Sequence, residues 1–144
     1  MIITEPQDFM AHWLTERISY VPTPNLRCIG NYSTRLQELI GVVAFDNWSE
    51  CSVEMHTAGN GNWLTRELLY KSFSYPFDHG GVNTVICRID SGNARSLKFC
   101  ERIGYKEQCR IPNAWEGSRD MVIVAMQKHE CRWLNLFSAQ KEAA

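Results

Sequence analysis

The sequence has no long hydrophobic run, since no stretch approaches the roughly 18 apolar residues of a membrane span. Its first residues, Met-Ile-Ile-Thr-Glu-Pro, lack the basic start and apolar stretch of a secretory signal. An excess of positive charge is also missing, because 15 Lys and Arg stand against 16 Asp and Glu. Non-specific nucleic-acid binding relies on a strong basic field. We therefore predict a cytoplasmic protein that binds neither membranes nor nucleic acid.

Metal-site spacing is absent as well. The six cysteines include no C-x-x-C pair, and the histidines lie far from any cysteine pair except His129 near Cys131. Several cysteines, such as Cys87 in Val-Ile-Cys, have apolar neighbours, where a free thiol behaves as a small hydrophobe. The sequence therefore predicts reduced thiols and no metal site.

What the chain does contain is enough apolar material for one interior. Apolar residues make up 44% of its 144 residues, and aromatic residues make up 11%. Two independent cores are improbable at this length. We predict that residues 1–144 form a single domain.

Hydrophobic spacing and turn residues predict the element order β-α-β-β-β-α-β-α-β-β. The expected helices cover residues 6–18, 62–75 and 93–104, and an amphipathic tail covers 129–137; the first strand has no assigned range, and the other expected strands cover 26–32, 38–45, 50–58, 82–90, 105–111 and 121–126. The nearly continuous apolar run in 38–45 suits a sheet covered on both faces. The prediction is thus an α/β (α+β) fold with a mixed sheet between helices.

A glycine-bearing turn, Gly59-Asn60-Gly61, joins the strand 50–58 to the helix 62–75. A helix N-terminus offers unpaired N–H groups and partial positive charge, and glycine lets the backbone approach an anion. Arg66 lies one turn into this helix and adds a cation. The turn therefore predicts a phosphate site. The alternatives are that the glycine turn only connects the strand to the helix and that Arg66 lies on a solvated helix face.

The segment Asn93-Ala-Arg-Ser-Leu-Lys-Phe-Cys-Glu-Arg-Ile-Gly-Tyr105 resembles the N-x-x-S-…-x-x-G-F/Y signature of the GNAT superfamily of N-acetyltransferases. The subgroup it most resembles contains the ribosomal-protein N-terminal acetyltransferases. Upstream, the stretch from Gly61 to Leu68, with Phe77 ten residues after Glu67, matches that subgroup in length. The resemblance covers residues 38–126, and the chain is also similar to short GNAT-like proteins of tailed bacteriophages.

The resemblance implies a GNAT fold with a mostly antiparallel sheet of about six to seven strands and two central strands that splay apart. It implies acetyl-coenzyme A (acetyl-CoA) as donor and a primary amine as acceptor, which is a protein N-terminus, a lysine or a small amine. The acetyl group would move by direct attack in a ternary complex, and homodimer formation stays open. The implied cofactor-binding residues are Met55, Thr57, Gly59, Gly61, Asn62, Trp63, Leu64, Thr65, Arg66, Asn93 and Ser96.

Three residues depart from the family pattern. Thr57 stands where the family has a basic or amide residue, if Asn60 is aligned with the first loop glycine. Trp63 stands in place of a loop glycine, so its indole would either line or obstruct the cofactor groove. Cys100 stands where many members have a tyrosine that protonates the leaving thiolate. The last two departures support an alternative, a catalytically inactive GNAT-like binding protein that acts through a protein partner.

Glu54 and His56 are the candidate catalytic residues, because they share one face of the strand 50–58 that leads to the glycine turn. An imidazole with a pKa near ~6.5 suits the removal of a proton from an amine. The alternative is that both are polar residues on a half-exposed strand.

Overall fold

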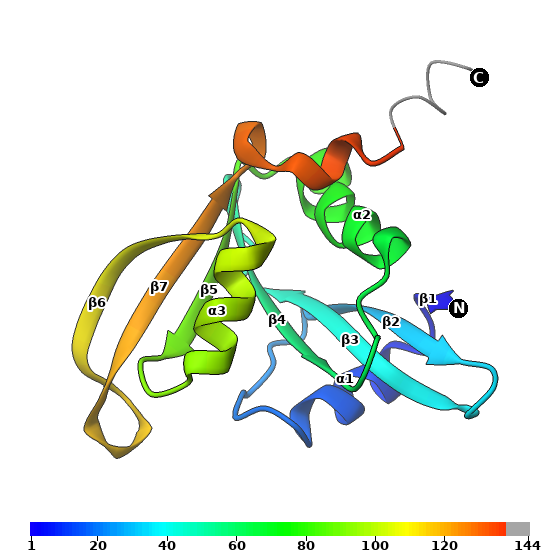
Figure 1. The fold of residues 1–144 in the computed structure, drawn as a ribbon, viewed down its shortest axis with the longest axis horizontal. Helices are drawn as coiled ribbons and strands as arrows, with labels where there is room; N and C mark the ends of the chain where they lie inside the picture. The colour runs from blue at the N-terminus through cyan, green and yellow to red at the C-terminus, as the bar shows by residue number, and fades with distance from the viewer. Residues whose placement is uncertain (138–144) are drawn as a thin grey trace.

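The structure is a computed structural model that describes residues 1–137 (Figure 1). Residues 138–144, which the single-domain prediction includes, lie outside the described residues. The order of the helices and strands is the predicted one. The elements are β1 (Ile2–Ile3), α1 (Gln7–Thr15), β2 (Arg27–Ser33), β3 (Glu38–Asp46), β4 (Ser52–Gly59), α2 (Arg66–Ser74), β5 (Thr84–Asp90), α3 (Ala94–Ile103), β6 (Lys106–Trp115) and β7 (Arg119–Gln127).

One mixed sheet contains all seven strands, in the order β1-β2-β3-β4-β5-β7-β6. Every neighbouring pair is antiparallel except β4 and β5, which are parallel. Helix α1 covers one face of the sheet, while α2 and α3 cover the other (Figure 1). The predicted mixed, mostly antiparallel sheet with helices on both faces is confirmed.

The apolar run in β3 shows how one strand serves both faces. Val42 packs with Met10 and Leu14 of α1, whereas Val43 and Phe45 belong to the larger core beneath α2 and α3. Successive side chains of a strand point to opposite faces, so a strand covered on both sides needs apolar residues throughout.

The two halves of the sheet separate between β4 and β5. Their parallel pairing joins Ser52–Glu54 to residues 84–86 and then stops, so among the described residues the β5-facing edge of β4 beyond Glu54 has no strand partner. Figure 1 shows the two strands diverging from this point. The predicted splaying of the central strands is confirmed.

The start of α2 corrects the predicted helix 62–75, because α2 begins four residues later, at Arg66. The Thr65 hydroxyl accepts a hydrogen bond from the Leu68 N–H at 3.1 Å, which is an N-cap. The indole of Trp63 packs against the sheet, and the residues before Arg66 form a loop around it. A π-helical turn, Tyr75–His79, follows α2.

The ends of α3 are as predicted. The Asn93 side chain accepts a hydrogen bond from the Ser96 N–H at 3.1 Å, and Gly104 ends the helix with a φ of 115°.

The last two strands are longer than predicted, so the turn between them shrinks to Glu116–Ser118. Helix α1 ends at Thr15, three residues before the predicted end, and residues 128–135 form 3-10 turns. None of the helices within residues 1–137 has the length and apolarity of a bilayer span.

Candidate functional site

A cavity of about 480 Å³ opens where β4 and β5 separate, and we call it the β4–β5 cleft. On the α3 side its wall includes Met55, Cys87 and Phe99. On the α1 side its wall includes His56 and Arg88, since alternation along each strand turns them to the opposite face. The segment after α1, residues 17–20, and the end of β6, residues 114–116, complete the wall.

The structure brings five of the predicted site residues together in this cleft: Met55, His56, Thr57, Asn93 and Ser96. Glu54 lies behind His56 and contacts it. The remaining predicted residues lie outside the cavity wall, at the last position of β4, in the loop between β4 and α2 and at the first position of α2: Gly59, Gly61, Asn62, Trp63, Leu64, Thr65 and Arg66. The predicted donor site is thus split between the cleft and the adjacent loop.

Two glycines form the seat of the Trp63 indole. Gly41 of β3 and Gly59 of β4 are paired in register, and the ring lies against both. A Cβ at Gly59 would lie 2.2 Å from the indole, and one at Gly41 would lie 2.4 Å from it. Gly59 is therefore required for packing of Trp63. The indole stacks on Phe99, with ring centroids 6.1 Å apart, and it is Phe99 that lines the cavity, so the indole does not plug the cleft.

The loop before α2 presents free amide groups. Asn60 donates to the Ile40 carbonyl at 2.7 Å, and Leu68 donates to Thr65, but no hydrogen bond within residues 1–137 uses the N–H groups of residues 61–67. Gly61 has a φ of 60°, and a Cβ built on it would meet no atom within 4 Å. The exposed Arg66 has no ion-pair partner in the same described stretch. Free amides beside a cation at a helix N-terminus suit an anion.

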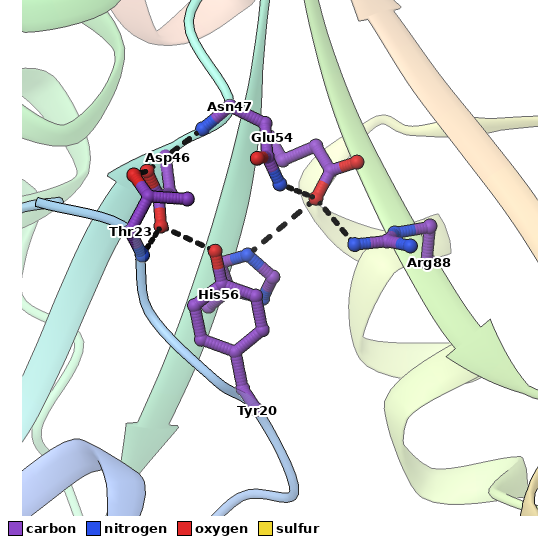
Figure 2. Close-up of polar contacts among 7 residues, drawn as sticks. All are labelled: Tyr20, Thr23, Asp46, Asn47, Glu54, His56 and Arg88. Carbon is purple, nitrogen blue, oxygen red and sulfur yellow. Dashed lines mark hydrogen bonds and ion pairs between the residues drawn. The ribbon is translucent and has the colours of Figure 1, made fainter. Parts of the chain in front are cut away.

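Asp46, at the end of β3, anchors the segment that follows α1 (Figure 2). Its buried carboxylate accepts hydrogen bonds from the hydroxyls of Tyr20 and Thr23, from the Thr23 N–H at 2.8 Å and from the Asn47 N–H at 2.9 Å. Burial alone would raise the pKa of Asp46, but the hydrogen bonds from Thr23 and Tyr20 outweigh it and lower that pKa. Asp46 is therefore a carboxylate at neutral pH that fixes the position of Tyr20.

His56 has one ring nitrogen that the described structure leaves unsatisfied. Nε2 is buried without a hydrogen-bond partner in residues 1–137 and lies 3.7 Å from Glu54 Oε2 (Figure 2). Burial lowers the pKa of His56, although the Glu54 charge opposes this shift. The imidazole is therefore neutral at neutral pH. A buried polar atom without a partner costs free energy, so it marks a candidate functional group.

Glu54 is already engaged by two donors. Its Oε2 accepts from Arg88 Nη2 and from Asn47 Nδ2, each at 2.9 Å (Figure 2). A carboxylate held in this way is poorly placed to take a proton from a substrate. The geometry instead suits a residue that orients His56 and balances charge behind it.

Sequence reasoning missed three contributors to this side of the site: Tyr20, Asp46 and Arg88. The contact between Tyr20 and Asp46 spans 26 residues, and no local pattern encodes it. The one signal in the sequence was Asp46, an acidic residue directly after the apolar strand 38–45.

Two buried thiols, Cys87 and Cys100, also line the cleft. The interaction with the Cys100 thiol and burial together raise the pKa of Cys87. All six cysteines are free, as predicted. At the same wall, the Tyr105 hydroxyl donates to Met55 Sδ at 3.4 Å.

No protein-family model matches the sequence, and no curated protein matches it either. By structure, the chain is similar to the spermidine N-acetyltransferase SpeG of Vibrio cholerae in complex with CoA and spermine. The TM-score is 0.73 at 14% identity, covering 94% of this chain and 98% of that chain. For the dodecameric form of that enzyme in an intermediate state, the TM-score is 0.71 at 15% identity, covering 89% of this chain and 93% of that chain.

This chain has the GNAT fold. The likeness extends over nearly the full length of both chains. At 14% identity it establishes the architecture, and the chemistry is argued from the residues of the site.

Proposed function

We propose that this protein is an N-acetyltransferase that moves an acetyl group from acetyl-CoA to a primary amine in a ternary complex. The observation that carries the proposal is the edge of β4 beyond Glu54, which faces a 480 Å³ cavity instead of a strand. An extended ligand can hydrogen-bond to such an edge as an added strand does. The structural neighbours with this architecture are acetyltransferases, one of them in complex with CoA.

The donor would bind along the α3 side of the cleft. The main chain of residues 55–57 pairs with the pantetheine arm, and Asn93 and Ser96 border it. The free amides of residues 61–67 and the guanidinium of Arg66 hold the pyrophosphate, since both are available to an anion. Trp63, seated on its glycines, flanks this path through its stack on Phe99.

The acceptor amine would enter from the α1 side, where His56 lies. The neutral imidazole accepts the proton of the incoming ammonium group, and the free amine then attacks the acetyl carbonyl. The carbon–nitrogen bond forms as the carbon–sulfur bond breaks, and the proton that the attacking nitrogen loses is taken up by the departing thiolate, so that CoA leaves as the thiol. Glu54, fixed by Arg88 and Asn47, holds the imidazole in place.

The direct test is titration with acetyl-CoA, followed by thiol release in the presence of amines. A ligand at a hundred times its dissociation constant adds about 2.7 kcal/mol to the free energy of unfolding, which a thermal shift detects. Gly61→Asp places a charge among the free amides and should weaken acetyl-CoA binding at least tenfold. Unchanged affinity in the folded variant would remove the loop from the donor site.

A second candidate is the inactive GNAT-like binding protein, favoured by the position of Trp63 beside the donor path and by Cys100 in the cleft. Acetyl-CoA that produces no thermal shift would support it. The finer resemblances, to the ribosomal-protein subgroup and to phage proteins, stay predictions, as do cytoplasmic location, the single domain and the homodimer. The acceptor type, a protein N-terminus, a lysine or a small amine, is likewise a prediction.

A further inference from the structure

Four charged side chains line the α1 side of the cleft, where the acceptor enters if the proposed function holds. They are Arg17, Arg88, Asp90 and Glu116. Glu54, immediately behind His56, is a fifth. The partners that these groups already have determine which charge they can still bind on a ligand.

The carboxylates are already engaged. Asp90 accepts from Arg119 Nε at 2.9 Å to both of its oxygens, and it lies 2.7 Å from Arg119 Nη2. Glu54 accepts from Arg88 and Asn47. Glu116 accepts from the Ser19 hydroxyl at 2.6 Å and lies in the field of Arg119. Asp90 thus has both oxygens engaged, and within residues 1–137 only Glu54 Oε1 and Glu116 Oε2 are left without a hydrogen bond. The charge of Glu54 is already balanced by Arg88, so a second cationic group on the acceptor would find little uncompensated negative charge there.

The arginines, by contrast, retain donors. Arg17 uses Nη1, which donates to the Trp13 carbonyl at 2.8 Å and lies 3.8 Å from Glu16 Oε2, and its guanidinium lies 3.7 Å from the Trp13 ring centroid. Arg88 uses Nη2 for Glu54. A guanidinium has five N–H donors. Within residues 1–137, both arginines thus keep Nε and one Nη without a hydrogen bond, and the stack on Trp13 holds the Arg17 group in place.

Glu54 contacts both Arg88 and His56 and therefore limits the distance between these two groups. Arg88 Nη2 lies 2.9 Å from Glu54 Oε2, and His56 Nε2 lies 3.7 Å from the same oxygen. The guanidinium and the imidazole are therefore close neighbours. A ligand that contacts both groups carries its amine and its anion only a few bonds apart.

We propose that the acceptor is a small primary amine that also carries an anionic group, a carboxylate or a phosphate, which Arg17 and Arg88 bind while the amine faces His56. This inference rests on the proposed function and names the substrate class of the same site. A cavity of about 480 Å³ is within the size range of small-molecule sites. Amino acids and aminoalkyl phosphates have the required chemistry.

The experiment compares matched amines with the wild-type protein and acetyl-CoA, with thiol release as the readout. Amino acids are paired with their amides, and phosphoethanolamine is paired with ethanolamine; spermidine is the cationic arm. The anionic member of at least one pair should have a kcat/KM at least tenfold above that of its neutral partner and of spermidine. The two pair types distinguish carboxylate from phosphate.

Arg17→Gln should raise the KM for the preferred anionic acceptor at least tenfold, with unchanged affinity for acetyl-CoA, and Arg17→Lys should recover part of the loss. Arg35→Gln, in the exposed β2–β3 turn, is the matched control and should change nothing. Equal turnover of the paired amines, or a preference for spermidine, would overturn this inference and leave the acetyltransferase proposal standing. If acetyl-CoA does not bind, the acetyltransferase proposal is overturned. Titration of the protein with the same paired amines would then decide whether the site prefers the anionic member.

Discussion

The imidazole of His56 stacks on the phenol ring of Tyr20, with ring centroids 3.9 Å apart and 29° between the planes. Tyr20 is itself fixed by its hydrogen bond to the buried Asp46. The candidate base is thus positioned by a segment that joins α1 to β2, and not by its own strand alone. This arrangement leads to several measurable consequences.

The first concerns the pH dependence of the rate. Because burial lowers the pKa of His56, the neutral base is already formed below the ordinary value of about 6.5. The acidic limb of kcat/KM should therefore fall below pH 6.5, and His56→Ala should lose that limb together with at least tenfold in rate. A limb that persists in His56→Ala would assign the titration to another group.

The same pH–rate measurement separates the role of Glu54 from that of His56. Its charge raises the pKa of His56 against the effect of burial, so Glu54→Gln should lower that pKa further. The acidic limb should move to lower pH while turnover persists. Loss of all turnover, without such a movement, would instead indicate that Glu54 is the base. Glu38→Gln, at the exposed start of β3, is the control.

Stability should also depend on His56. The folded-state pKa is depressed, so below about pH 6.5 the unfolded chain binds a proton that the folded chain resists. The free energy of unfolding should therefore fall as the pH decreases through 6.5 toward the folded-state pKa. Urea unfolding of wild type and His56→Phe at pH 7.5 and 5.5 measures this difference, which should be smaller in the variant.

Asp46→Ala should destabilise the fold and displace Tyr20. The substitution leaves the hydroxyls of Tyr20 and Thr23 without their buried acceptor, at a cost of roughly 2–4 kcal/mol. Urea unfolding gives the change, and Asp8→Ala on the exposed side of α1 should shift stability by less than about 1 kcal/mol. A small effect at Asp46 would mean that the segment after α1 is held by packing.

Gly59→Ala tests the seat of Trp63. The added methyl group would lie 2.2 Å from the indole, so the ring must move, at a cost of roughly 1–3 kcal/mol. Gly92→Ala, where the nearest atom is 3.3 Å away, is the matched control. The cost of Gly59→Ala should largely disappear in a Trp63→Ala background. Equal costs in both backgrounds would show that Trp63 is not the obstacle.

The sequence predicted those parts of the fold that local patterns encode. Asn93 and Gly104 mark the ends of α3 because one is a side-chain cap and the other adopts a left-handed backbone. The two-sided burial of β3 followed from its apolar run. Local patterns failed at Trp63, because its packing on glycines from two different strands delays the start of α2.

The site was predictable in its position and not in its electrostatics. Strand alternation placed Glu54 and His56 on one face, and both are there. Their difference in role depends on Arg88, which is 34 residues from Glu54, and on Tyr20, which is 36 residues before His56 in the numbering. Such long-range partners decide which group titrates, and residue type alone does not reveal them.

The short pairing between β4 and β5 leaves an unsatisfied strand edge inside the molecule. On an outer strand, such an edge would attract other chains and promote self-association. Here the edge lies between two half-sheets and faces the β4–β5 cleft, where it is not presented as the outer edge of the sheet. Under the proposed function, the same open backbone groups serve the donor.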